Sequence, residues 1–173
     1  MNRRIFEVCT IPALAALIFL GVAPSASAQD ERPGASIDLY GARVDTIQSS
    51  AGHGTAYGLR GGYRFNSTWA LEGSAEHLDE GFTNWFVDVS AKAFLIDTSH
   101  FEVYALAGPG LFRVSAFGES EDQATVHAGI GAQFGLGSSR AYLRPEIRSR
   151  WATDDLKFND GLVSYSLGIG WRF

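Results

Sequence analysis

Cysteine is nearly absent from this chain: the 173-residue sequence has one, Cys9, in a segment that the mature protein loses in our interpretation. A mature chain without cysteine builds neither disulfides nor thiolate metal sites. Uninterrupted runs of about 18 apolar residues are also missing, which excludes a membrane-spanning helix. Lys and Arg number 14 against 19 Asp and Glu and do not cluster, so nucleic-acid binding is not expected.

The N-terminal segment has the pattern of a secretory signal peptide. Arg3 and Arg4 precede an apolar run over residues 11–23, which is too short to span a bilayer, and Ala26-Ser27-Ala28 forms a small-residue cleavage site. The sequence therefore predicts a signal peptide over residues 1–28 and one mature domain over residues 29–173.

The C-terminal segment alternates strictly between apolar and small or polar residues. Its apolar positions are Val163, Tyr165, Leu167, Ile169, Trp171 and Phe173. A period of two places these side chains on one face of a β-strand. A soluble sheet seldom ends on a bare apolar strand, because such an edge invites pairing with other chains. In a closed transmembrane barrel the last strand pairs with the first, and lipid covers its apolar face.

Similar segments recur along the whole mature chain, separated by connections of two sizes. Strands are predicted at 35–45, 55–65, 69–77, 85–96, 101–114, 125–136, 141–152 and 161–173. Tight turns at 66–68, 97–100 and 137–140 alternate with longer polar loops at 46–54, 78–84, 115–124 and 153–160. This organisation predicts an all-β fold, an eight-stranded antiparallel up-and-down transmembrane β-barrel with short turns toward the periplasm. The phase of the first strand stays open, because Ile37 and Leu39 support one face and Tyr40, Ala42 and Val44 the other.

The two faces of the predicted strands differ in chemistry. Aromatic residues of the lipid phase gather near the strand ends, as two membrane-interface girdles would require; they are Phe65, Trp69, Trp171 and Phe173 at one end and Trp85 and Trp151 at the other. The opposite phase carries charges of both signs, namely Arg60, Arg64, Glu72, Glu76, Asp88, Lys92, Arg144, Glu146, Arg148, Arg150 and Arg172. Eight strands enclose a lumen that side chains can fill, so these groups are predicted to form a bridged interior network, with glycines of the same phase making room for the arginines.

These motifs resemble the small eight-stranded outer-membrane barrels of the OmpX and Ail type, which share their architecture with the OmpA transmembrane domain. The resemblance rests on residues 56–65 (AYGLRGGYRF), 69–73 (WALEG), 104–110 and the ending GIGWRF. It implies residence in a Gram-negative outer membrane as a monomer, in contact with outer-membrane lipid and lipopolysaccharide. The terminal Trp171 and Phe173 are similar to the signal that the outer-membrane barrel assembly machinery reads.

A structural or surface-interaction role without catalysis or cofactors is the favoured function. A narrow porin-like channel is the alternative, and a soluble lipocalin-like barrel is disfavoured by the charged interior. A lipid A-modifying hydrolase needs a nucleophile held by a base, but His127 has no serine two positions later, and the sequence assigns no partner to Ser90.

Divalent cations are a further possibility at the predicted outer loops, whose carboxylates are the oxygen ligands that Mg²⁺ and Ca²⁺ prefer. We expect a solvated acidic rim instead; the residues are Asp79, Glu80, Glu119, Glu121, Asp122, Asp154, Asp155 and Asp160. Arg150, near the outer end of its strand, is an alternative contact for a lipid phosphate.

Overall fold

A computed structural model describes residues 33–46, 53–79, 83–116, 119–137, 140–153 and 161–173. The predicted signal peptide at 1–28 lies outside these residues, as do the loop carboxylates Glu80, Asp154, Asp155 and Asp160. The described part contains no helix of the length and apolar character needed to cross a membrane.

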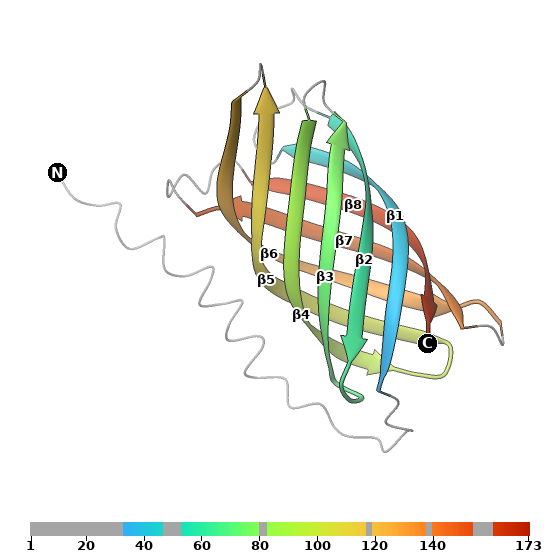
Figure 1. Ribbon diagram of the computed structural model, residues 1–173. Coiled ribbons are helices and arrows are strands. Elements are labelled where there is room, and N and C mark those ends of the chain that lie inside the picture. The colour runs from blue at the N-terminus through green and yellow to red at the C-terminus, as the bar shows by residue number, and fades with distance from the viewer. Residues whose placement is uncertain (1–32, 47–52, 80–82, 117–118, 138–139, 154–160) are drawn as a thin grey trace.

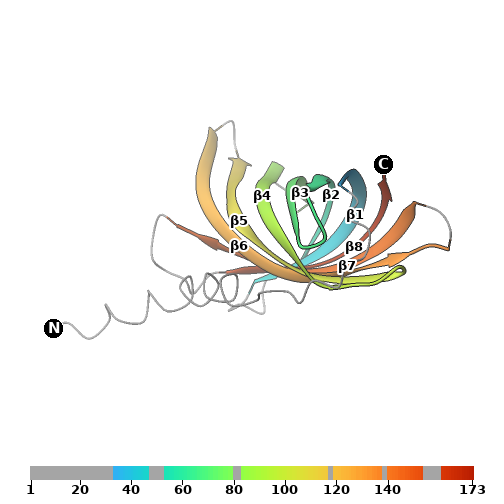
Figure 2. The ribbon, with the colours of Figure 1, turned by 90° about the horizontal axis from the view of Figure 1, so that it is seen from below.

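The described residues form eight strands that close into one barrel in the order of the sequence (Figures 1 and 2). Each strand is antiparallel to both neighbours, and β1 completes the circle by pairing with β8. The predicted eight-stranded antiparallel up-and-down barrel is therefore confirmed. The strands are β1 Gly34–Thr46, β2 His53–Arg64, β3 Trp69–Asp79, β4 Thr83–Asp97, β5 Phe101–Ala116, β6 Glu119–Gly135, β7 Ala141–Ala152 and β8 Leu162–Arg172.

The two ends of the barrel differ in their connections. The turn end, as we name it, carries the tight connections between β2 and β3, β4 and β5, and β6 and β7, together with the start of β1 and the C-terminal Phe173 (Figure 1). At this end Asn66 closes the first turn by accepting 2.8 Å hydrogen bonds from the backbone of Thr68 and Trp69. The opposite end, the loop end, carries the other connections: 47–52 and 153–161 are longer than any of the turns, whereas 80–82 and 117–118 are as short as the turns or shorter.

Side chains alternate between the exterior and the lumen as the sequence period predicts. In β8, Tyr165, Leu167, Ile169 and Trp171 face outward and are 46–60% exposed, while Ser164 and Ser166 are buried. The open question of β1 is also resolved: Ile37 and Leu39 are exposed, whereas Tyr40 and Val44 are buried in the lumen. Both apolar phases of this strand are real, because its inner face is itself largely apolar toward the loop end.

The predicted loop at 115–124 is wrong. Strand β5 continues to Ala116 and β6 begins at Glu119, and the two remain paired out to Ala116 and Glu119. On the exterior of this ribbon Arg113 pairs with Asp122 at 2.6 Å. Apolar alternation ends where the exterior becomes polar, but backbone pairing does not depend on apolar side chains, so the strands run further than the pattern indicates.

Three tyrosines fill the lumen against glycines of the adjacent strand. Each tyrosine stands directly opposite a glycine in the pairing register; the pairs are Tyr40 with Gly58, Tyr104 with Gly131 and Tyr142 with Gly170. A Cβ at any of these glycines would overlap the phenol ring. The glycines therefore admit tyrosine rings, and the expectation that they make room chiefly for arginines is corrected.

Candidate functional site

The lumen of the barrel contains two sets of ion pairs: one of ten residues around Arg144, and one at the turn end in which Arg64 and Arg172 pair with Asp97 and Glu102. Within the described residues, seven cations and seven carboxylates participate: Arg60, Arg64, Lys92, Arg144, Arg148, Arg150 and Arg172 with Asp38, Glu72, Glu76, Asp88, Asp97, Glu102 and Glu146. All eleven residues of the predicted interior set occur here, and sequence reasoning missed Asp38, Asp97 and Glu102. The numbers of positive and negative charges are equal, so each buried charge can have a counter-charge. An uncompensated buried charge would be costly.

Arg144 lies at the centre of this network and is fully buried. Its Nη1 donates to Asp38 Oδ2 at 2.8 Å and to Glu72 Oε2 at 2.6 Å. Its Nη2 donates to Glu72 Oε1 at 2.8 Å and to Glu146 Oε2 at 2.6 Å, and Nε donates to the Tyr104 hydroxyl. One guanidinium thus links β7 to β1, β3 and β5 across the lumen.

The tyrosine rings join the same network. Each hydroxyl donates to a carboxylate: Tyr40 to Glu76 at 2.8 Å, Tyr104 to Glu146 at 2.8 Å and Tyr142 to Asp38 at 3.3 Å. A guanidinium also lies over each ring, from Arg60 at 3.6 Å, Arg144 at 4.9 Å and Arg172 at 5.1 Å, respectively. The same arrangement therefore occurs three times: a glycine faces a tyrosine ring, an arginine lies over that ring, and a carboxylate accepts from its hydroxyl. These contacts hold the arginine and the carboxylate in fixed orientations.

Toward the loop end, Arg148 and Arg150 converge on Asp88. Their donors lie 2.8 and 3.0 Å from Asp88 Oδ2, and Arg150 also pairs with Glu76 at 2.9 Å. Arg150 is 3% exposed and donates to Ser164 on the neighbouring strand β8. The alternative that Arg150 contacts a lipid phosphate is therefore wrong, because its side chain points inward.

A cluster of apolar side chains, which we call the apolar plug, occupies the lumen beyond these arginines. It consists of the buried side chains of Val44, Ala56, Leu78 and Phe86, with Phe112 packed against them. The Phe86 and Phe112 rings stack with centroids 4.3 Å apart. Periodicity alone could not reveal this plug, because apolar residues on the inner face make a strand read as apolar on both sides.

Ser90 and His127 form a contact that the sequence did not indicate. Ser90 Oγ lies 2.8 Å from His127 Nε2, and His127 Nδ1 lies 3.6 Å from Asp88 Oδ1. The order of the three groups is that of a nucleophile, a base and an orienting carboxylate. All three side chains are at most 2% exposed, however, and Asp88 is held by two arginines. The arrangement places a serine beside a base but gives a substrate no surface from which to reach it.

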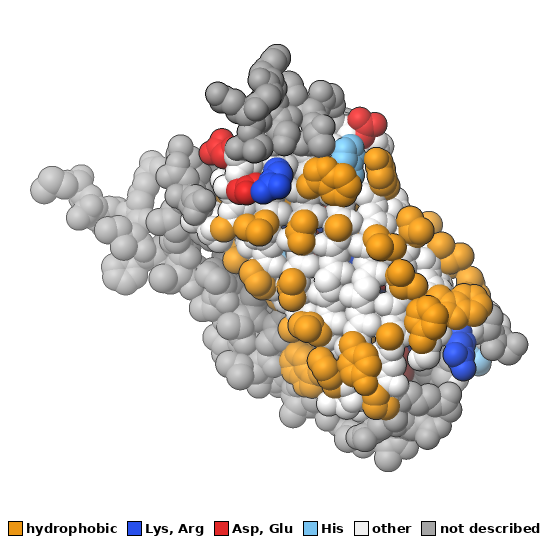
Figure 3. All heavy atoms as spheres, in the orientation of Figure 1, with side chains coloured by type: hydrophobic (Ala, Val, Ile, Leu, Met, Phe, Trp, Pro, Cys, Tyr) orange, Lys and Arg blue, Asp and Glu red, His pale blue; other side chains and the backbone are white. Residues whose placement is uncertain are grey.

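The aromatic residues predicted as girdles lie on the exterior of the barrel near its two ends. Trp85 at the loop end is 41% exposed, and Phe65, Trp171 and Phe173 at the turn end are 46–68% exposed. Trp69 and Trp151 are partly buried at the turn and loop ends. In the view of Figure 3, apolar side chains are spread over the exterior between the two ends. The charged side chains lie near the ends.

The acidic residues of the loop end are only partly within the described chain. Asp79, Glu121 and Asp122 are exposed, and Asp122 is paired with Arg113. Among the described residues, no three His, Cys, Asp or Glu side chains lie close enough together to hold a metal ion.

Comparison with known proteins identifies a family. The model of the outer membrane protein beta-barrel domain matches residues 13–173. No curated protein matches the chain.

Solved structures share the architecture of this barrel. The N-terminal β-barrel domain of Pseudomonas aeruginosa OprF has 13% identity and a TM-score of 0.64, covering 82% of this chain and 100% of that one. Ail of Yersinia pestis has 21% identity and a TM-score of 0.58, covering 84% and 100%. OprG of P. aeruginosa has 15% identity and a TM-score of 0.59, covering 83% and 97%. These likenesses show the fold.

Proposed function

The chain belongs to the outer membrane protein β-barrel domain family, and from this premise we propose that it is a non-catalytic integral outer-membrane protein with a structural or surface-interaction role. The observation that carries the proposal is the filled lumen, in which the Arg144 network and the apolar plug follow one another along the barrel axis. A barrel closed in this way supports a role that depends on its outer surfaces.

The proposed topology follows from the two ends of the barrel. After removal of a signal peptide at 1–28, the domain at 29–173 would insert with its turn end in the periplasm. Its loop end, which carries the two longest connections at 47–52 and 153–161, would lie outside, as the longer loops of bacterial barrels do. Trp85 and Trp151 would then lie at the outer interface and Phe65, Trp69, Trp171 and Phe173 at the inner one. Lipid and lipopolysaccharide would surround a monomer.

We expect the reconstituted protein to show little or no steady conductance. The Arg144 network crosses the lumen, and an ion would have to separate buried ion pairs and then pass the apolar plug. Planar-bilayer recording measures this directly. Large stable single-channel steps at neutral pH would contradict the closed lumen and favour the porin-like alternative; Phe86→Ala with Phe112→Ala tests whether the plug contributes to the seal.

The proposed absence of catalysis rests on the position of the Ser90–His127 pair. A general base must come within hydrogen-bond reach of a bound substrate, but Ser90 and His127 lie between charged layers of the interior and are 1% and 2% exposed. Their hydrogen bond satisfies two buried polar groups, as a packed polar interior needs.

A surface role does not point to a polyanionic partner in this chain. One solved structure shows Ail of Y. pestis in complex with the heparin analogue sucrose octasulfate. In the described part of this chain, the exposed loop-end cations Arg43 and Arg113 are each paired with a carboxylate, Asp45 at 3.1 Å and Asp122 at 2.6 Å. Compensated cations leave little net attraction for sulfate groups.

Trp171 and Phe173 are proposed to act as an assembly signal during biogenesis. Changing Phe173 to serine should reduce the folded barrel recovered from outer membranes, while refolding from urea into detergent changes much less. In the finished barrel Phe173 is 68% exposed, so its ring contributes at most about 1.5–3 kcal/mol through contact with lipid. Heat-dependent gel mobility reports the folded fraction in both preparations.

Phe65→Ser provides the matched control, because Phe65 is an exposed aromatic residue at the same end of the barrel, 53% exposed. It should lower neither fraction strongly. If Phe173→Ser and Phe65→Ser reduce assembly in cells equally, or if Phe173→Ser reduces both fractions together, the terminal residue acts through stability and the assembly-signal proposal fails.

A further inference from the structure

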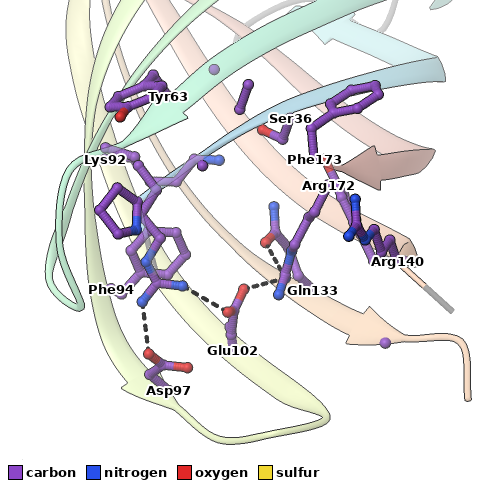
Figure 4. A pocket seen from close by; sticks show the side chains of 18 of the residues that line it. Ser36, Tyr63, Lys92, Phe94, Asp97, Glu102, Gln133, Arg140, Arg172 and Phe173 are labelled. Carbon is purple, nitrogen blue, oxygen red and sulfur yellow. Dashed lines mark hydrogen bonds and ion pairs between the residues drawn. The ribbon is translucent and has the colours of Figure 1, made fainter. Parts of the chain in front are cut away.

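At its turn end the lumen contains a vestibule of about 1130 Å³, which lies on the turn-end side of the Lys92–Glu72 ion pair. Its lining is both polar and aromatic and includes Lys92, Phe94, Gln133, Arg140, Tyr142 and Arg172 (Figure 4). A concave space of this size is large enough for a small molecule. Among the described residues, the Arg144 network and the apolar plug lie between the vestibule and the loop end, so the vestibule opens toward the turn end.

Two arginines stand side by side on the wall of this vestibule. Ala141 pairs with Trp171 in the register of β7 and β8, and the backbone of Arg172 donates to Arg140 at 3.0 Å. Arg140 and Arg172 are therefore direct cross-strand neighbours, and both line the vestibule. Like charges directly opposite each other destabilise a sheet. Arg172 is paired with Glu102, whereas no carboxylate among the described residues pairs with Arg140, so an anion between the two guanidinium groups would compensate the charge of Arg140.

Arg172 is held in place by its neighbours. Its Nη2 donates to Glu102 and, at 2.9 Å, to Gln133, and its guanidinium lies over the Tyr142 ring. In the described part of the chain no hydrogen bond engages its Nε or Nη1, and the side chain is 43% exposed. Glu102, Gln133 and Tyr142 thus act as positioning residues that leave one edge of the guanidinium available.

The remaining charges of the vestibule favour an anion over a cation. Glu72, Asp97 and Glu102 also line it, but each is bound by cations: Glu72 by Lys92 and Arg144, and Asp97 and Glu102 by Arg64. Arg140 is exposed and has no carboxylate partner among the described residues. In Figure 4, Lys92 lies across the vestibule from Arg172, and its ammonium is paired with Glu72 at 2.6 Å.

We infer that the vestibule is a binding site for a small oxyanion of the periplasm, such as a dicarboxylate, held between Arg140 and Arg172 with Lys92 facing it. The planar guanidinium matches two carboxylate oxygens, which gives such contacts their strength and their geometry. That the ligand comes from the periplasm rests on the proposed function, which places the turn end there. The binding of an oxyanion depends only on the residues of the vestibule.

Succinate is the probe, titrated at constant ionic strength into the barrel folded in an uncharged detergent that contains no lipid phosphate. Backbone amide spectra should show saturable shifts at residues 34–36, 133–137, 140–142 and 170–173, and none around Arg113 at the loop end. Butanediol, which has the same chain length without charge, should produce no such shifts. Arg140→Gln and Arg172→Gln should each weaken succinate binding by about tenfold or more.

Arg113→Gln is the control variant, since it removes an exposed arginine at the other end without touching the vestibule. The inference is overturned if succinate gives no saturable shift, if butanediol gives the same shifts, or if the two vestibule variants bind as the control does. These outcomes leave the conductance result untouched, so failure of this site is distinguishable from failure of the proposed function. Arg140 is exposed, so Arg140→Gln keeps the test valid even if Arg172→Gln folds poorly.

Discussion

Replacing Arg144 with methionine is expected to lower the free energy of unfolding by about 3–5 kcal/mol. The side chain is fully buried and donates hydrogen bonds to Asp38, Glu72 and Glu146. Removing it leaves carboxylates in the lumen with fewer counter-charges than they need, and an uncompensated buried charge is far more costly than the loss of one ion pair. Urea-dependent unfolding in detergent, followed by tryptophan fluorescence, measures the change.

Two variants separate this cause from the loss of an arginine as such. Arg113→Met removes the exposed partner of Asp122 and should change stability by at most about 1 kcal/mol, as surface ion pairs do. Adding Glu72→Gln to Arg144→Met removes one of the stranded charges and should restore part of the loss, which a double-mutant cycle quantifies. Equal losses in Arg144→Met and Arg113→Met would show that the interior network does not hold the barrel together.

The exterior of the barrel was predictable from sequence, because lipid-facing residues must be apolar and the pleat repeats every two residues. Strand β8 shows this throughout its length. Apolar alternation does not mark a strand where its exterior need not be apolar. At Arg113 and Asp122 the exterior is already charged, yet the backbone pairing continues to Ala116 and Glu119, so apolar alternation could not locate the end of the β5–β6 ribbon.

The interior was predictable only where it is charged. Charges such as Arg60 and Glu72 mark the lumen phase because the bilayer excludes them from the other face. Asp38 was missed because apolar residues of β1 support both phases, with Val44 in the plug, and Glu102 because β5 reads as apolar on both faces, with Leu106 filling the interior. The contact between Ser90 and His127 joins β4 to β6 across the lumen, and no spacing in the sequence encodes such a distance.

A single arginine on the lipid face should nearly match the effect of breaking the network. Val89 is 48% exposed on the exterior of β4, opposite Gly73 in the register. It lies four residues from Trp85, which at 3.3 Å per residue is about 13 Å along the strand from the proposed outer interface. Val89→Arg therefore places a cation near the middle of the bilayer, where it costs roughly 2–4 kcal/mol. Unfolding in lipid vesicles is the measurement, because detergent micelles lack a defined midplane.

Val163→Arg is the matched control, since it makes the same change on the exterior of β8 close to the loop end. Val163 stands opposite Asp45 in the register, so an arginine there has both a carboxylate and interfacial water within reach. Its cost should fall to about 0–1 kcal/mol, as expected for a cation near the interface. The difference between the two variants cancels the loss of valine and reports the depth of the arginine in the membrane together with its access to Asp45 and interfacial water. If both variants lose equal stability, then Val89 does not face the bilayer core, and the proposed position of the barrel in the membrane is wrong.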